Sequence, residues 1–219
     1  MRSVQISVII PLYDCEKYIG RCLRSLLKQT LNDSEYEIIV INDCSNDSSK
    51  DAIKPFMGDI RLLNNEKRLG LPATLNKGIR QAKGQFIVRV DADDYVHWDY
   101  LKILSMHLQL NNHMHAIACD YLLVDDQQNV LSHENCLEKP IGCGIMFRLD
   151  HLISIGLYNE DFFAREEEEL SLRFKKQYQI SRVELHLYRY RKHDQNLTNN
   201  KSQMKNFAKK LDNKKNDNE

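Results

Sequence analysis

The feature that most constrains this chain is a short apolar segment that ends in three carboxylates. Residues 86–90 read Phe-Ile-Val-Arg-Val, and Asp91, Asp93 and Asp94 follow at once. β-Branched and aromatic residues favour a strand, and Gly84 supplies a turn before it. Because the segment is apolar nearly throughout, it is typical of a strand covered on both faces, as in a parallel sheet. The chain is therefore expected to build a sheet between layers of helices.

The first half of the chain alternates strand and helix patterns with short connections. Strands are predicted at 4–10, 36–41, 60–63 and 86–90, and helices at 17–28, 48–57 and 73–82, with Asp14 as the N-cap of the first helix. Such alternation predicts a parallel α/β sheet with right-handed crossovers. In sheets of this kind, ligands bind at the carboxyl ends of the strands.

Polar residues follow three of these predicted strands. They are Tyr13 with Asp14, Asn42 with Asp43, and the acidic group Asp91, Asp93 and Asp94. Asp91 and Asp93 lie two residues apart, so in an extended chain their side chains share a face. Clustered carboxylates suit a divalent cation, Mn²⁺ or Mg²⁺, held together with substrate phosphates. A solvated turn or a helix N-terminus would also accommodate such acids, but their company at two other strand ends favours a site.

The second half has a less regular pattern. A helix is predicted at 95–110, strands at 115–124 and 130–133, and a loop entering a strand at 140–147. A helix at 149–155 ends at Gly156, a second helix begins with the glutamates from 166 onward, and a last strand covers 183–190. Residues 199–219 are polar and rich in Lys and Asn, which predicts a disordered tail or a frayed helix.

Composition excludes several classes of protein. A chain of 219 residues suits one domain, and its net charge of zero does not indicate a nucleic-acid partner. The six cysteines form no CxxC pair, so neither a zinc site nor a disulfide framework is expected. No secretion signal and no membrane-spanning stretch is recognised. The prediction is a cytoplasmic protein, with peripheral contact of the basic tail to the inner face of the membrane left open.

Taken together, these segments resemble the family 2 glycosyltransferases, which have the GT-A fold. The resemblance covers about residues 3–198 and rests on the order of five motifs. They are Pro-Leu-Tyr-Asp at 11–14, Val-Ile-Asn-Asp-Cys-Ser-Asn-Asp at 40–47, Gly-Leu-Pro-Ala-Thr-Leu-Asn-Lys-Gly at 70–78, Asp-Ala-Asp-Asp at 91–94 and Glu-Glu-Glu-Glu-Leu-Ser-Leu-Arg at 166–173. The chain departs from the family pattern at Asp14, Asn42, Thr74, Leu75 and Glu167.

The resemblance implies an α/β, Rossmann-like GT-A fold with a mainly parallel central sheet and helices on both faces. A single domain would span 1–198, with residues 1–98 as the nucleotide-binding half and 99–198 as the acceptor-binding half. The implied partners are a nucleotide-sugar donor, most simply a UDP-sugar, and a carbohydrate or lipid-linked acceptor. The implied role is in the assembly of bacterial surface polysaccharide or glycolipid.

The resemblance also implies site residues. Those expected at the nucleotide are Pro11, Tyr13, Asp14, Asp43, Arg68, Asn76, Asp91 and Ala92. Asp43 would accept a hydrogen bond from the base, whereas Asn76 would either orient the chain near the diphosphate or pack locally. Asp93 would bind Mn²⁺ or Mg²⁺, with Asp91 as a second contact or a bridge to the ribose. His193 would be a third ligand or a surface group.

An inverting transferase also needs a general base that deprotonates the acceptor hydroxyl. Glu167 occupies the position of the family's acid, but the run of four glutamates leaves Glu166 and Glu168 as alternatives. Asp94 is expected in the outer shell of the metal or as a helix N-cap. Arg191 or Lys192 would meet the diphosphate or belong to a solvated basic run.

Three other functions fit the sequence less well. A sugar nucleotidyltransferase would need a Gly-rich loop with basic residues after the first strand, and residues 11–14 have none. A dinucleotide-dependent dehydrogenase would need G-x-G-x-x-G after a strand, which is absent. A non-catalytic nucleotide-sugar-binding homologue is suggested by the departures at Asp14, Asn42 and Glu167.

Overall fold

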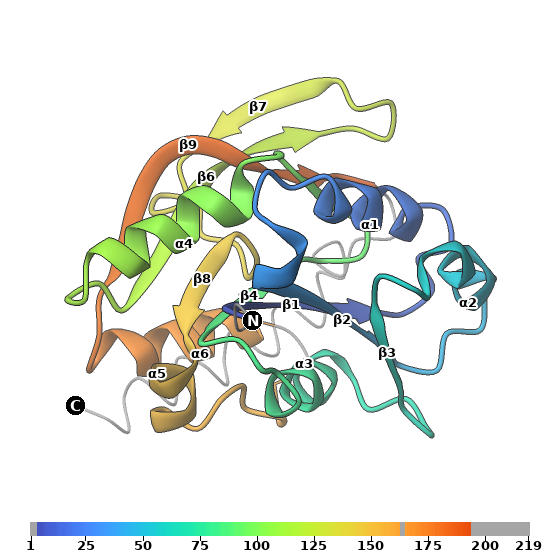
Figure 1. Cartoon of the computed structure of the whole chain (residues 1–219), viewed down its shortest axis with the longest axis horizontal. Helices are drawn as coiled ribbons and strands as arrows, with labels where there is room; N and C mark the ends of the chain where they lie inside the picture. The colour runs from blue at the N-terminus through green and yellow to red at the C-terminus, as the bar shows by residue number, and fades with distance from the viewer. Residues whose placement is uncertain (1–3, 163–164, 194–219) are drawn as a thin grey trace.

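The computed structural model describes residues 4–162 and 165–193, so the predicted tail at 199–219 lies outside the described residues. Its centre is a mixed sheet of nine strands in the order β3-β2-β1-β4-β8-β6-β9-β5, with β7 paired to β6 (Figure 1). The strands are β1 Ile6–Leu12, β2 Tyr36–Asn42, β3 Arg61–Asn64, β4 Phe86–Arg89, β5 Tyr95–Val96, β6 Ala116–Val124, β7 Val130–Glu134, β8 Ile145–Arg148 and β9 Ile180–Arg191.

Helices cover both faces of the sheet (Figure 1). They are α1 Ile19–Leu27, α2 Ser49–Ala52, α3 Leu71–Arg80, α4 Tyr100–Leu110, α5 Leu149–Ser154 and α6 Glu166–Lys175, with 3₁₀ turns η1 Asp33–Glu35 and η2 Lys54–Phe56. None of the helices in the described ranges has the length and apolar character needed to cross a bilayer.

Two apolar cores lie on opposite faces of the sheet. In β2, Ile38 and Val40 face one core, while Ile39 and Ile41 face the other. The first core packs against α1 and α4, and the second packs against α3, α5 and α6. Alternate side chains of a strand point to opposite faces, so a strand with two covered faces must be apolar at nearly every position. This explains the continuous apolar segments seen in the sequence.

The parallel part of the sheet is confined to the first half of the chain. β1 pairs in parallel with both β2 and β4, and β2 with β3. The second half joins through antiparallel pairs of β8 with β4 and with β6, and only β9 runs parallel to its neighbour β6. The expectation of a mainly parallel sheet therefore holds for the half that carries the strand-end motifs.

Three local predictions were wrong. Residues 95–110 are not one helix, because Tyr95–Val96 forms β5 against β9 and α4 begins only at Tyr100. The helix predicted at 48–57 breaks into α2 and η2, because a proline lies in the first turn of η2 and has no N–H to donate. Asp14 does not cap α1, which begins at Ile19.

Candidate active site

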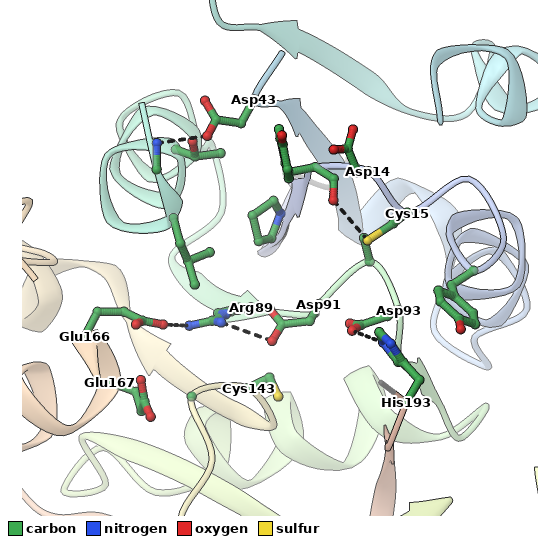
Figure 2. Close-up of a pocket in the computed structure, with 18 of the residues that line it drawn as sticks. Asp14, Cys15, Asp43, Arg89, Asp91, Asp93, Cys143, Glu166, Glu167 and His193 are labelled. Atoms are coloured by element: carbon green, nitrogen blue, oxygen red, sulfur yellow. Dashed lines mark hydrogen bonds and ion pairs between the residues drawn. The ribbon is translucent and has the colours of Figure 1, made fainter. Parts of the chain in front are cut away.

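The carboxyl ends of β1, β2 and β4 open into a cavity of about 830 Å³. Both halves of the chain contribute to its walls (Figure 2). The predicted site residues that line it are Pro11, Tyr13, Asp14, Asp43, Arg68, Asp91, Ala92, Asp93, Glu166, Glu167 and His193. The structure therefore brings together side chains that are up to 182 positions apart in the sequence, from Pro11 to His193.

Asp43 fixes the loop that precedes α3. Its Oδ1 accepts hydrogen bonds from the Leu69 amide (2.7 Å) and from Asn65 Nδ2 (2.7 Å), and its Oδ2 accepts from the Gly70 amide (2.9 Å). Gly70 has a φ of 87°, a left-handed conformation that glycine adopts without strain. An ionised carboxylate has about four acceptor sites, so one site on Oδ2 remains for a further donor.

Tyr13 and Arg68 form a stacked pair at the wall of the cavity. The Arg68 guanidinium carbon lies 3.7 Å from the centre of the Tyr13 ring. This is the distance of a cation–π contact, and it presents a flat, partly charged surface. Asp14 lies close by and joins two loops, since its Oδ1 accepts from the Asn46 amide at 2.7 Å.

Arg89 is the centre of the ionic network in the cavity. Its guanidinium donates to both carboxylate oxygens of Asp91, with Nε–Oδ1 at 2.6 Å, and to Glu166 Oε1 at 2.9 Å. Arg89 is only 9% exposed, so two carboxylates in contact with it offset the cost of burying its charge. Figure 2 shows this chain of charges running from Glu166 through Arg89 to Asp91.

Asp93 and His193 are in contact with each other at the wall of the cavity. The distance from Asp93 Oδ2 to His193 Nε2 is 2.9 Å, and the ring of Tyr18 stacks on the imidazole with the ring centres 4.8 Å apart. An oxygen and an imidazole nitrogen together suit Mn²⁺, whereas Mg²⁺ prefers oxygen ligands throughout. The pair therefore fits a divalent ion, and Mn²⁺ better than Mg²⁺.

Asp94 lies behind the cavity rather than in it. It is buried, and it accepts from the Tyr188 hydroxyl and from the Arg191 amide, both at 2.7 Å. Burial, and then the charges of Asp93 and Asp91, raise the pKa of the Asp94 carboxyl well above its ordinary value. The helix that follows is capped at Asp99, so Asp94 is not an N-cap. It anchors β9 to the acidic loop instead.

The glutamate run separates into paired and unpaired members. Glu166 bonds to Arg89, Glu168 to Arg165 and Glu169 to Arg173. Glu167 lines the cavity and makes no ion pair among residues 4–162 and 165–193. Burial, and then the charge of Glu166, raise the pKa of Glu167 to about 7, against the opposing effect of Arg89. Its carboxyl group is thus suited to exchange a proton near neutral pH.

Asn76 is the one predicted nucleotide contact that does not line this cavity. Its side chain is buried, accepts from the Tyr158 amide (3.0 Å), and donates to the Tyr158 carbonyl and to Glu160 Oε1 (2.9 Å each). It ties α3 to the loop before α6, which corresponds to the local packing weighed as its alternative.

The sequence reasoning missed Arg89 as a site residue. A charged residue within an apolar strand was the available signal, because a buried charge requires a partner. Tyr18 and Tyr188 were also missed, and both lie in segments whose patterns resemble ordinary core.

Comparison with models of protein families identifies the family of this chain. The model of glycosyl transferase family 2 matches residues 7–146, more than half of the chain. The chain belongs to glycosyl transferase family 2. The matched residues include β2, β4 and all of β1 except Ile6, so they contain all three strand ends that open into the cavity.

Curated relatives of this family 2 chain are similar over about half of its length. The poly(ribitol-phosphate) β-N-acetylglucosaminyltransferase TarS of Staphylococcus aureus is 36% identical over 102 residues, which is 45% of this chain and 18% of TarS. The putative glycosyltransferase EpsH of Bacillus subtilis is 33% identical over 123 residues, 55% of this chain and 35% of EpsH. The chain thus spans about a third or less of these relatives.

Solved structures confirm the fold. S. aureus TarS 1–349 in complex with UDP-GlcNAc superposes with a TM-score of 0.77 at 22% identity, covering 90% of this chain and 61% of that one. A mannosyltransferase from Pyrobaculum calidifontis in complex with GDP-Man and Mn²⁺ gives 0.71 at 18% identity, covering 90% and 59%. The predicted GT-A, Rossmann-like fold is confirmed by these matches, with a mixed sheet in place of a mainly parallel one.

Proposed function

We propose that this chain is an inverting, metal-dependent glycosyltransferase that moves a sugar from a UDP-sugar to a hydroxyl acceptor. The observation that carries the proposal is one cavity with two chemically different ends. Asp43, Asp91 and Asp93 lie at the ends of the parallel strands, and Glu167, with a raised pKa and no ion pair among the described residues, lies across from them.

The donor would bind along the strand ends. Asp43 has one acceptor site on Oδ2 left over by its loop contacts, which suits the ring N–H of a uracil base. Tyr13 and the stacked Arg68 would flank that base, and Pro11 would close the pocket beside it. TarS structures that share this fold were solved with UDP and with UDP-GlcNAc, which supports uridine in the donor.

Asp93 and His193 would hold the divalent ion. The Asp91 carboxylate is bonded to Arg89 and lies close to Asp94 and Cys143, so it would support this pair from the neighbouring loop position. The Arg89 guanidinium keeps Asp91 in place while leaving about half of its acceptor sites open. When bound, the ion neutralises the charge that develops on the leaving diphosphate. The mannosyltransferase with Mn²⁺ shares the fold, which supports a metal of the same kind here.

Glu167 would act as the general base. Direct displacement at the anomeric carbon inverts its configuration and requires removal of the proton of the acceptor hydroxyl. Glu166 is held by Arg89 and Glu168 by Arg165, so Glu167 alone of these three alternatives keeps its carboxylate available. Arg89 would position Glu166 and Asp91, and so set the distance between donor and base.

The acceptor is proposed to be a carbohydrate or a lipid-linked sugar in bacterial surface polysaccharide or glycolipid assembly, in the cytoplasm or at the inner face of the membrane. The names of TarS and of the poly(ribitol-phosphate) β-glucosyltransferase of Bacillus spizizenii support a surface polymer. The alternative remains a homologue that binds the nucleotide-sugar without turning it over.

Calorimetric binding of UDP, with GDP and CMP as comparators and with or without Mn²⁺, tests the donor site first. UDP is expected to bind best, and only with Mn²⁺. Asp43→Asn should weaken binding of UDP, whereas Asp150→Asn, at an exposed position on α5 outside the cavity, should not. Failure of all three nucleotides to bind a folded protein contradicts the proposal.

Release of UDP from a panel of UDP-sugars separates the two candidate functions. A transferase is expected to hydrolyse its donor slowly without acceptor, because water can replace the acceptor hydroxyl. Tight binding without any release, in the presence of extracts that contain acceptors, would favour the non-catalytic homologue.

A further inference from the structure

A second cavity of about 210 Å³ adjoins the first. Its floor is formed by Phe147 and Tyr158, which are 6% and 5% exposed. Leu137 and Leu172 lie at its mouth, where they are 54% and 37% exposed. Most of the side chains that line this cavity are apolar, from the buried Phe147 to the exposed Leu137, and such a surface favours an apolar occupant.

The two cavities meet at Glu167. Glu167 and the loop at 140–142 line both of them, whereas Asp43, Asp93 and His193 line the first alone. Figure 2 shows Glu166 pointing at Arg89, with Glu167 set apart from that ion pair. A Cβ at Gly142 would lie 2.8 Å from the Arg89 guanidinium and 3.0 Å from Glu167 Cβ. The loop is therefore packed tightly between the donor side and the base.

The second cavity has little to offer a charged or strongly polar ligand. Its charged members besides Glu167 are Glu168, which is bonded to Arg165, and the exposed Lys175. A sugar ring buried there would leave most of its hydroxyls without partners, which is costly. At about 30 Å³ for each water-sized group, the volume suits a chain of about seven carbons.

We propose that this cavity binds an apolar segment of the acceptor, and so selects an acceptor whose attacking hydroxyl is carried close to an alkyl or lipid chain. The inference rests on the proposed function, since it places that hydroxyl at Glu167. It decides between the two acceptor classes in favour of the lipid-linked one. The hydroxyl lies at the junction of the cavities, and the apolar segment extends toward Leu137 and Leu172.

Straight-chain alcohols from propanol to nonanol are the simplest probes of this cavity. With the donor that the enzyme hydrolyses, each alcohol is expected to yield an alkyl glycoside, which mass spectrometry detects. Each buried methylene group improves binding about fourfold. The apparent KM should therefore fall about fourfold per added carbon up to about heptanol, and then level off.

Ser171→Phe fills the cavity from α6, where Ser171 is partly exposed. In this variant the dependence on chain length should flatten, and the ratio of heptyl glycoside to hydrolysed donor should fall at least about tenfold, the effect of two lost methylene groups. Ser154→Phe is the matched control, because Ser154 is exposed on α5 and lines neither cavity. Leu172→Ser, at the exposed mouth, is a second test that does not disturb the core. It should lower the same ratio of heptyl glycoside to hydrolysed donor, but by less than Ser171→Phe does.

The outcomes separate this inference from the function on which it rests. Donor hydrolysis with a KM that does not change along the alcohol series overturns the inference and leaves the transferase intact. The inference is overturned as well if Ser171→Phe and Ser154→Phe show the same dependence of KM on alcohol chain length. Calorimetric binding of heptanol to a protein that breaks down no donor overturns the acceptor role together with the proposed function.

Discussion

The two halves of this chain build their parts of the site in different ways. In the first half, β1, β2 and β4 run parallel, so the residues that follow them meet at one edge of the sheet. In the second half, the site residues come from the N-terminus of α6 and from the end of β9. The parallel strand order alone therefore brings Asp43 and Asp93 to the same edge of the sheet. The positions of Glu167 and His193 depend instead on how the second half packs against the first.

The halves are joined by buried polar contacts. Arg89 bonds to Glu166, Tyr188 to Asp94, and Asn76 to the Tyr158 backbone. Each contact satisfies a group that would be costly to bury alone. These contacts hold α6 and β9 against the strand ends of the first half, and so set the distance between the proposed donor site and the proposed base. If the halves act as proposed, changes in the first should alter donor binding and changes in the second should alter transfer.

The largest expected effect is that of Glu167→Gln. Loss of the general base should lower the rate of transfer by about 10² to 10⁴-fold, while the Kd for UDP with Mn²⁺ stays within about twofold. Transfer by the unaltered protein should rise with pH through about 7, because the base must be ionised. Steady-state rates across pH and calorimetry check both points. Weaker UDP binding in the variant would break the division between the halves.

Asp93→Ala should be next in size. Without Asp93 the divalent ion that would stabilise the charge on the leaving diphosphate should bind poorly. Loss of such stabilisation lowers rates by about 10² to 10³-fold, and here donor binding should suffer too. The expected result is UDP binding that no longer responds to Mn²⁺, with an unchanged circular dichroism spectrum. Asp126→Ala serves as a control, because Asp126 contacts Tyr18 near the site but does not line the cavity. Full metal-stimulated activity in Asp93→Ala would contradict the metal assignment.

Arg89→Met and Arg182→Met form a pair that sharpens the comparison. Each substitution removes an arginine that is bonded to largely buried carboxylates. Arg89 is bonded to Asp91 and Glu166, and Arg182 is bonded to Asp120. Removing one partner of such a pair costs about 3–5 kcal/mol when it is fully buried. Both variants should be less stable to urea, by up to that amount for Arg89 and by less for the more exposed Arg182.

Only Arg89→Met should also change the chemistry. The Arg89 charge lowers the pKa of Glu167, so its loss should move the rise in the rate to higher pH. It should also weaken UDP binding, because Asp91 loses its support. The same pH profile in Arg89→Met and Arg182→Met would show that Arg89 has a structural role alone.

The part of the cavity formed by the strand ends was predictable from the sequence, because ligand sites and strand ends coincide in a parallel sheet. Asp43, Asp91 and Asp93 all line the cavity, as expected. The position of Asn76 was not predictable, because a buried amide on a helix can face either the ligand or a neighbouring loop. Arg89 was missed although its partner Asp91 is only two positions away, and its second partner, Glu166, is 77 positions away.

The proposed base could not be distinguished from its neighbours by sequence, because four consecutive glutamates are chemically identical there. What separates them is the position of three arginines, Arg89, Arg165 and Arg173, each paired with one of the others. Two of these partners lie within a turn of the helix, but Arg89 arrives from the first half. The change from parallel to antiparallel strands within the sheet was also not predicted. It depends on β8, which pairs with β4 of the first half and with β6 of the second half.

The smallest expected effect is on stability, and it concerns the same glutamate. In the folded protein the pKa of Glu167 is raised from its ordinary 4.5 to about 7. Between these values the folded state binds more protons than the unfolded state, so this group makes stability fall as pH rises. Above pH 7 the full cost applies, at most about 3.4 kcal/mol. Glu167→Gln should therefore match the unaltered protein at pH 4.5 and exceed its unfolding free energy at pH 8.

Glu168→Gln is the matched control for this measurement. Glu168 is paired with Arg165 at the surface, and a pair of this kind contributes about 1 kcal/mol or less. Urea unfolding of both variants at the two pH values separates the contribution of the Glu167 charge to the unfolding free energy from that of an ordinary surface glutamate. A gain in stability for Glu167→Gln that is equal at pH 4.5 and pH 8 would mean that Glu167 is ionised without cost. In that case the second half would supply an ordinary surface acid, not a base prepared for transfer.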